Sequence, residues 1–175
     1  VDPFSLVHSY GADAVRYYLL REIPPAEDGD FSEDKFVERY NADLANDLGN
    51  LVSRVSNMVE RYLDGVVPTV DLPESDYSLE DVSRLISQYR FNEALESTWR
   101  IVRQANKLVD NEKPWELYSK SNLDKLQVVL AQLVVMVQDI CLALEPFLPS
   151  TAKTIQQHFN QPRITKLTAL FPRIL

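Results

Sequence analysis

The chain has 175 residues, of which 45% are hydrophobic, and its formal net charge at pH 7 is −8. This length suits one domain, and the apolar content excludes an intrinsically disordered chain. Four glycines are too few for a many-stranded β fold or a glycine-rich phosphate loop, and the acidic balance excludes a uniformly basic nucleic-acid binder but not a local basic stripe.

The first half of the chain predicts two helical segments. Residues 4–23 place apolar side chains at helical spacing, and Pro24 and Pro25 end that segment before a loop at residues 24–30. A long helix is predicted from the N-cap Ser32 to the C-terminal glycine Gly65. Its apolar stripe has spacings of three and four and comprises Val37, Tyr40, Leu44, Leu48, Leu51, Val55, Met58 and Tyr62.

Prolines divide the second half into further helices. One helical region begins near Ser78 and bends at residues 89–92, and Pro114 suits the first position of a short helix at 114–119. The strongly apolar stretch 128–148 is interrupted by polar residues, which indicates a buried core helix and not a membrane span. Ser150 is expected to cap a last helix that ends near Phe159, and residues 160–175 have no clear pattern. The fold expected from these elements is an all-α helix bundle.

Groups that could carry catalysis or bind a metal are sparse. His8 and His158 have no metal-ligand partner at suitable spacing, so both are interpreted as surface or packing residues. Cys141 is the only cysteine and lies in an apolar run, which indicates a buried small hydrophobe. We therefore expect no catalytic residue and no metal site in this chain.

The long helix carries a second, polar face. An α-helix turns about 100° per residue, so the angular position of each side chain around the helix axis can be calculated. The residues of the polar face all lie within about 40° of Asn50, whereas the apolar stripe is centred about 115° away from Asn50. Asn is a poor helix former, so several on one face suggest a use, and Asn and Arg side chains can contact base edges or phosphates. A solvated face with incidental Asn residues is the alternative. The face comprises Arg39, Asp43, Asn46, Asn50, Arg54, Asn57 and Arg61.

Two more positions are candidates for contact with a ligand or with another helix. Gly49 lies inside the long helix, where glycine costs about 1 kcal/mol against alanine, so something is expected to approach the backbone closely. Trp115 lies at a helix joint, where it can plug the core or offer a flat face for an unpaired base. Trp99 lies on an apolar stripe in mid-helix and is predicted to be core.

Six runs of residues carry a family resemblance: Val1–Phe4, Tyr10–Arg21, Asp28–Ser32, Arg39–Leu51, Asn111–Trp115 and Leu144–Pro149. Together they resemble methionyl-tRNA synthetases. The resemblance covers nearly all of residues 1–160 and places residue 1 just downstream of that family's Lys-Met-Ser-Lys-Ser loop. The stretch at 41–51 is the most specific part, whereas the last two runs are shared more loosely with other class I synthetases.

The resemblance implies a function and a site. Residues 1–30 would be the end of a short helical segment that links catalytic and anticodon domains, and residues 31–175 would be the anticodon-binding domain. Asn50 and Arg54 match residues that hydrogen-bond the CAU anticodon of tRNA(Met), and Trp115 matches the aromatic residue that stacks on its first base. Asp110 and Pro114 match neighbours that shape the pocket. Asn46 lies on the same polar face as Asn50 and completes the predicted site.

The parent enzyme would attach methionine to tRNA with ATP and Mg²⁺, in the cytoplasm and without contact with a membrane. This chain lacks the family's catalytic motifs, so we expect it to be inactive alone and to need no cofactor. Its expected partners are the anticodon stem-loop and the catalytic domain of the same parent chain. That second contact predicts an exposed apolar patch around Tyr17, Tyr18 and Leu20.

Two other functions fit the residues less well. The anticodon-binding domain of another class I synthetase, for isoleucine, valine or leucine, shares the fold, but the stretch at 41–51 argues against it. A helical protein-interaction bundle with no RNA role would use Trp115 as a core residue.

Overall fold

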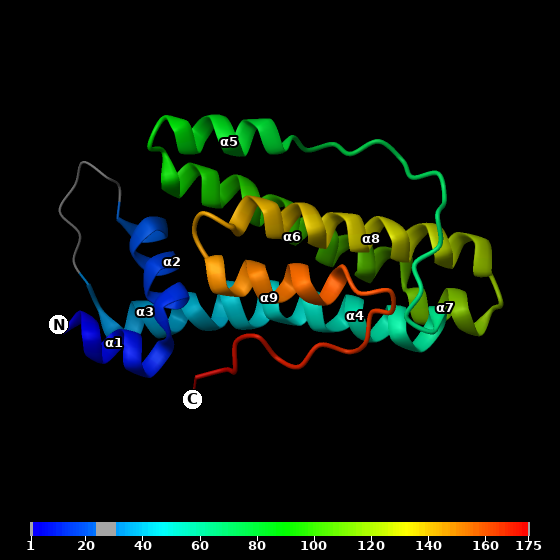
Figure 1. Ribbon diagram of the computed structural model, residues 1–175, viewed down its shortest axis with the longest axis horizontal. Helices are drawn as coiled ribbons and strands as arrows, with labels where there is room; N and C mark the ends of the chain where they lie inside the picture. Colours follow the sequence, from blue (N-terminus) through cyan, green and yellow to red (C-terminus); the bar gives the residue numbers. More distant parts are fainter. Residues whose placement is uncertain (1, 24–30, 175) are drawn as a thin grey trace.

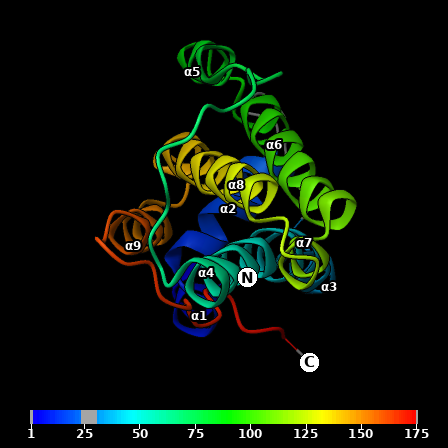
Figure 2. The same cartoon turned by 90° about the vertical axis from the view of Figure 1, so that its right-hand side faces the viewer.

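The computed structural model describes residues 2–23 and 31–174, so the predicted loop at 24–30 lies outside the described residues. The described part is helical and contains no strand, which confirms the predicted all-α bundle. The long helices α4, α6 and α8 run side by side, with α9 against them and α1 and α2 across one end (Figures 1 and 2). The elements are α1 (Pro3–Tyr10), α2 (Ala12–Glu22), α3 (Glu33–Arg39), η1 (Tyr40–Gly49), α4 (Asn50–Leu63), α5 (Leu79–Ser87), α6 (Phe91–Glu112), α7 (Pro114–Ser119), α8 (Leu123–Leu144) and α9 (Pro149–Phe159).

The long first-half helix forms as α3, η1 and α4 in one continuous rod, but its middle differs from the prediction. Ser32 caps it, since the Ser32 side chain accepts a hydrogen bond from the Lys35 amide at 3.5 Å. Asp64 and Gly65 end it at positive φ angles of 50° and 77°. Between these ends, η1 is a π-helix of 10 residues, in which each N–H bonds five residues back instead of four.

The π-helix explains the buried Gly49. A Cβ atom at Gly49 would lie 3.0 Å from the carbonyl oxygen of Leu44, five residues earlier in the same helix. The close approach predicted from the sequence is therefore made by the rod's own backbone. Neither a ligand nor a second helix is needed to account for this glycine.

The second half follows the prediction except at its last cap. Tyr89, at φ 59°, makes the bend between α5 and α6, and Pro114 opens α7. Helix α9 begins at Pro149 with Leu148 as its N-cap, so the prediction that Ser150 caps it is wrong. The reason is that proline has no N–H and suits the first helical position, where none is needed.

The core helix α8 is confirmed. Leu126, Leu130 and Leu133 are fully buried along it, and Ile140 and Leu144 continue the buried face. By length and composition alone, α8 is also the one described helix that could cross a membrane, with a mean hydropathy of 1.9. However, 61% of that stretch is buried inside the bundle, as expected for an interior helix of a globular domain.

Cys141 lies on α8 and is buried as predicted, and its thiol donates to the carbonyl of Ala152 at 2.9 Å. Burial raises the pKa of the Cys141 thiol to about 11. The thiolate is the reactive form, so at pH 8 its fraction is about 100-fold below that of a free thiol. We expect iodoacetamide to modify the native protein at least that much more slowly than the urea-unfolded protein, measured by mass spectrometry. Equal rates in both states would contradict the burial.

The predicted apolar patch around Tyr17, Tyr18 and Leu20 is wrong. Tyr17 is 0% and Tyr18 3% exposed, and Leu20 is partly buried, because α2 packs its inner face on η1 and α6. The centroids of the Tyr17 and Trp99 rings are 4.6 Å apart, and the Tyr17 hydroxyl donates to the Asp43 carboxylate at 2.5 Å.

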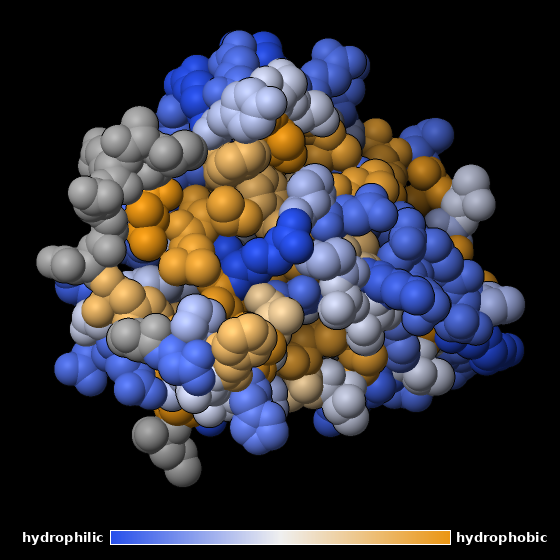
Figure 3. Space-filling view, turned by 60° about the vertical axis from the view of Figure 1, so that its left-hand side comes forward, coloured by the Kyte–Doolittle hydropathy of each residue, from blue (hydrophilic) through white to orange (hydrophobic). Residues whose placement is uncertain are grey.

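Other apolar side chains are exposed at that end of the bundle. They lie on α1 and α2. Figure 3 shows that apolar residues cover part of the molecular surface on the face seen in that view. The exposed side chains on α1 and α2 are Phe4 at 84%, Val7 at 40% and Leu19 at 41% exposure.

The C-terminal stretch has neither helix nor strand but is held along the rod. It runs antiparallel to α4 and η1. At its start the Ile164 N–H donates to the Gly65 carbonyl at 2.8 Å, and at its end Ile174 bonds Asn41. The Asn41 amide both accepts from the Ile174 N–H and donates to its carbonyl, each at 2.9 Å. Because these bonds use backbone groups, the stretch needs no periodic side-chain pattern, and its position could not be predicted from the sequence.

Candidate nucleic-acid interface

Two of the predicted site residues, Arg54 and Asp110, meet where α4 passes the end of α6, just before the joint that carries Trp115. Asn50 is the first residue of α4 and is exposed, and Arg54 follows one turn later. The Arg54 guanidinium donates to the Asp110 carboxylate at 2.9 Å, although 56 residues separate them. The two side chains are 38% and 65% exposed, so the pair lies at the surface beside the joint.

The joint positions Trp115 at the surface. Lys113 ends α6 in a left-handed conformation, with φ 45° and ψ 68°, outside the α region that a following proline disfavours. Pro114 is buried as the first residue of α7. The next residue, Trp115, is 42% exposed. Its interpretation as a core plug is therefore wrong, whereas Trp99, at 0% exposure, is core as predicted.

The polar face of the long helix is smaller than the helical-angle argument suggested. Asn46, Asn50 and Arg61 are exposed, but Asp43 is buried and bonds Tyr17 of α2. Arg39 pairs with Glu22 of α2 at 2.5 Å and with Asp43 at 3.4 Å. The prediction that Arg39 and Asp43 belong to the exposed polar face is therefore wrong. The reason is that η1 has more residues per turn than an α-helix, so side chains before residue 50 point in other directions than 100° per residue predicts.

Two features near the site were not found from the sequence. Asn106 on α6 donates its amide to the Asp47 carbonyl at 3.2 Å, which ties α6 to the end of η1. Glu116 on α7 accepts from Lys113 at 3.2 Å and from Lys120 at 3.0 Å, and these lysines lower its pKa. The only sequence signal for the Asn106 contact was an Asn in mid-helix. For the Glu116 ion pairs the signal was the spacing of three and four residues to the lysines.

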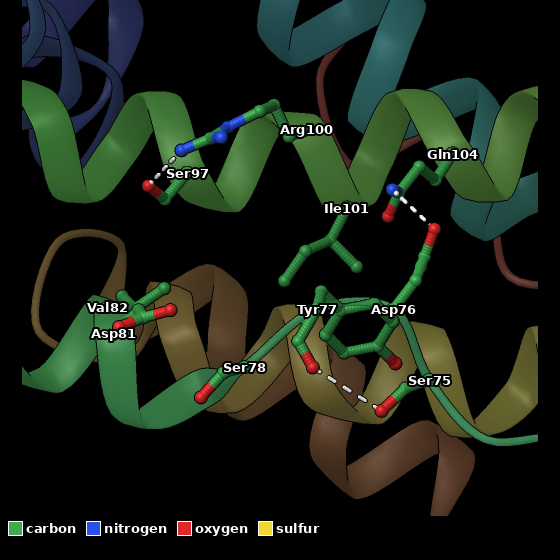
Figure 4. A pocket seen from close by; sticks show the side chains of 10 residues that line it. All are labelled: Ser75, Asp76, Tyr77, Ser78, Asp81, Val82, Ser97, Arg100, Ile101 and Gln104. Carbon is green, nitrogen blue, oxygen red and sulfur yellow. Dashed lines mark hydrogen bonds between the residues drawn. The ribbon is translucent and has the colours of Figure 1, made fainter.

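Elsewhere, a polar cleft of about 470 Å³ lies between α5 and α6 (Figure 4). Its polar side chains pair largely with each other: Gln104 donates to Asp76 at 3.3 Å, and Arg100 to Ser97 at 2.8 Å. Over residues 2–23 and 31–174, no three His, Cys, Asp or Glu side chains are grouped closely enough to hold a metal ion.

Known proteins share both the sequence and the fold of this chain. The profile of the family described as tRNA synthetases class I (M) matches residues 1–56. The methionine–tRNA ligase of Clostridium acetobutylicum is 41% identical over 170 residues, which cover 91% of this chain and 26% of that protein. The ligase of Thermotoga maritima is 37% identical over 164 residues, with coverages of 89% and 26%.

The chain is homologous to part of methionyl-tRNA synthetase. The crystal structure of the free Mycobacterium tuberculosis enzyme has a TM-score of 0.91 and 31% identity to this chain, covering 100% of it and 41% of the enzyme chain. The resemblance found in the sequence is confirmed, and so is the helical domain type. The chain spans about a quarter of the curated methionine–tRNA ligases that it matches.

Proposed function

We propose that this segment recognises the CAU anticodon of tRNA(Met) as part of a methionine–tRNA ligase. The observation that carries the proposal is the exposed Trp115, which follows by five residues the Asp110 that pairs with Arg54. An unpaired base needs a flat apolar surface for stacking and polar groups for its edge. Trp115 at the α6–α7 joint offers the flat surface, and Asn50 and Arg54 in the first turns of α4 offer the polar groups.

Each residue has a separate role in the proposal. Trp115 stacks on the first anticodon base, and the Asn50 amide offers a donor and an acceptor to a base edge. One amino group of the Arg54 guanidinium donates to Asp110, and this bond fixes the orientation of the guanidinium. The other N–H groups of Arg54 have no partner among the described residues. Those groups can donate to a base or phosphate. Pro114 sets the angle of Trp115, and Asn46 extends the polar face by one turn.

The wider activity belongs to the same proposal. The whole ligase would attach methionine to the bound tRNA with ATP and Mg²⁺, in the cytoplasm. This segment would supply recognition and pack against the catalytic domain. The similarity to methionine–tRNA ligases over most of the chain favours this activity over an isoleucine, valine or leucine enzyme.

A panel of anticodon stem-loops tests the proposal. We expect the CAU loop to bind about 10-fold or more tightly than GAU or CAC loops, since one well-made base contact discriminates by about 1–3 kcal/mol. Fluorescence anisotropy at fixed salt measures this, because phosphate contacts make every affinity depend on salt. Arg54→Ala should reduce the preference, whereas Arg100→Ala, in the distant α5–α6 cleft, should leave it intact. Tighter binding of any other anticodon contradicts the proposal.

A further inference from the structure

Helix α7 carries a second exposed aromatic side chain. Tyr118 lies three residues after Trp115 and is 48% exposed, close to the 42% of Trp115. Residues three apart on a helix are neighbours, with Cβ atoms about 5–6 Å apart. The two rings therefore share one side of α7, and consecutive nucleotides of one loop can reach both.

Tyr118 is held in place by Tyr62, in the last turn of α4. Their ring centroids are 4.7 Å apart and the ring planes differ by 28°, which is a stacked arrangement. Helix α7 lies beside this end of α4 in both ribbon views (Figures 1 and 2). This stacking holds the Tyr118 ring in a fixed orientation, and about half of the side chain remains open to solvent.

The charges around this pair suit a nucleic acid. The guanidinium carbon of Arg61 lies 5.7 Å from the centre of the Tyr62 ring, and Arg61 is exposed. Lys120 follows Tyr118 by two residues and is also exposed, and its ammonium pairs with Glu116 at 3.0 Å. Cations next to an aromatic face are the usual arrangement for single-stranded nucleic acids, where bases stack and phosphates bind Arg or Lys.

We propose that Tyr118, backed by Tyr62, is a second stacking platform that takes the unpaired base adjacent to the one on Trp115. The ligand is a nucleotide of the same anticodon loop, so this inference rests on the proposed function. It extends the site along α7 toward the C-terminal end of α4. Tyr62 is a positioning residue, because it orients the Tyr118 ring.

The test combines ring replacements with stem-loops that each lack one base. Tyr118→Leu keeps an apolar side chain but removes the π face, and we expect CAU stem-loop binding about 5- to 20-fold weaker. Tyr118→Phe should bind within about twofold of the wild type, since the ring remains. The matched control is Tyr89→Leu, because Tyr89 is 72% exposed at the α5–α6 bend.

Abasic loops separate stacking from a loss of structure. Removing the base adjacent to the one on Trp115 should weaken wild-type binding by the same factor, with no further loss in Tyr118→Leu. If Tyr118→Leu binds all loops like the wild type, or loses equally on every abasic loop, the second platform is overturned. Circular dichroism melting checks that the variant is folded.

The two proposals fail in different ways. If the wild type shows no preference for CAU, the proposed function fails and the platform fails with it. If the wild type prefers CAU and Trp115→Ala weakens binding but Tyr118→Leu does not, only the platform fails.

Discussion

Trp115→Ala is expected to weaken CAU stem-loop binding by roughly 5- to 100-fold, the range for one stacked base. The same change should lower the free energy of unfolding by only about 1 kcal/mol or less, because the side chain is 42% exposed and surface changes cost little. Anisotropy titrations and urea unfolding monitored by circular dichroism measure the two effects on the same protein samples.

The opposite pattern would favour a protein-interaction bundle. If Trp115 acted as a core plug, its loss would destabilise the fold by several kcal/mol and leave no specific RNA effect. The exposure of Trp115 already argues against that role. An unchanged stem-loop affinity in a folded Trp115→Ala variant would refute the stacking role.

Trp99→Ala is expected to lower the free energy of unfolding by about 3–5 kcal/mol, the cost of emptying a large core position. Trp99 is 0% exposed on α6, and its ring lies 4.6 Å from that of Tyr17 on α2. The loss would therefore loosen the contact between α2 and the bundle. Urea unfolding compares this variant with Trp115→Ala, the same substitution at an exposed position.

A second variant separates volume from polarity at Trp99. The indole N–H of Trp99 is buried and has no hydrogen-bond partner within residues 2–23 and 31–174, and an unpaired buried donor costs free energy. Trp99→Phe removes that donor and keeps an aromatic ring, so it should destabilise the fold much less than Trp99→Ala. Equal losses for the two variants would show that the ring volume does not determine the effect.

Much of the fold could be predicted because the helix signals are local. The boundaries at Ser32, Gly65 and Pro114 follow from side chains that cap or interrupt a helix within a few residues. Apolar periodicity identified α8 and placed Trp99 in the core. Among the predicted helix caps, that of α9 differed, because Pro149 precedes Ser150 and takes the first helical position.

The helical-angle argument failed where the helix type changed. It assumed 100° per residue from Arg39 to Arg61, but the π-helix η1 occupies residues 40–49. Asn50 and Arg54 lie within α4, so their relation held, whereas Arg39 and Asp43 turned toward α2. Gly49 in an apolar helix was the visible trace of this change, but no sequence rule links one glycine to a π-helix.

The helical elements, the family and the residue types of the candidate site could be predicted from the sequence, because these depend on local pattern and on similarity. Which aromatic side chains are exposed depends on the packing of the helices. Tyr17 is buried because α2 packs on η1 and α6. Trp115 is exposed on α7, whose direction is set by the left-handed turn at Lys113 and by packing on α8. Tyr118 gained a fixed orientation only through Tyr62, 56 positions earlier in the chain. Such exposures depend on how distant segments pack, and a single sequence contains no local signal for that packing.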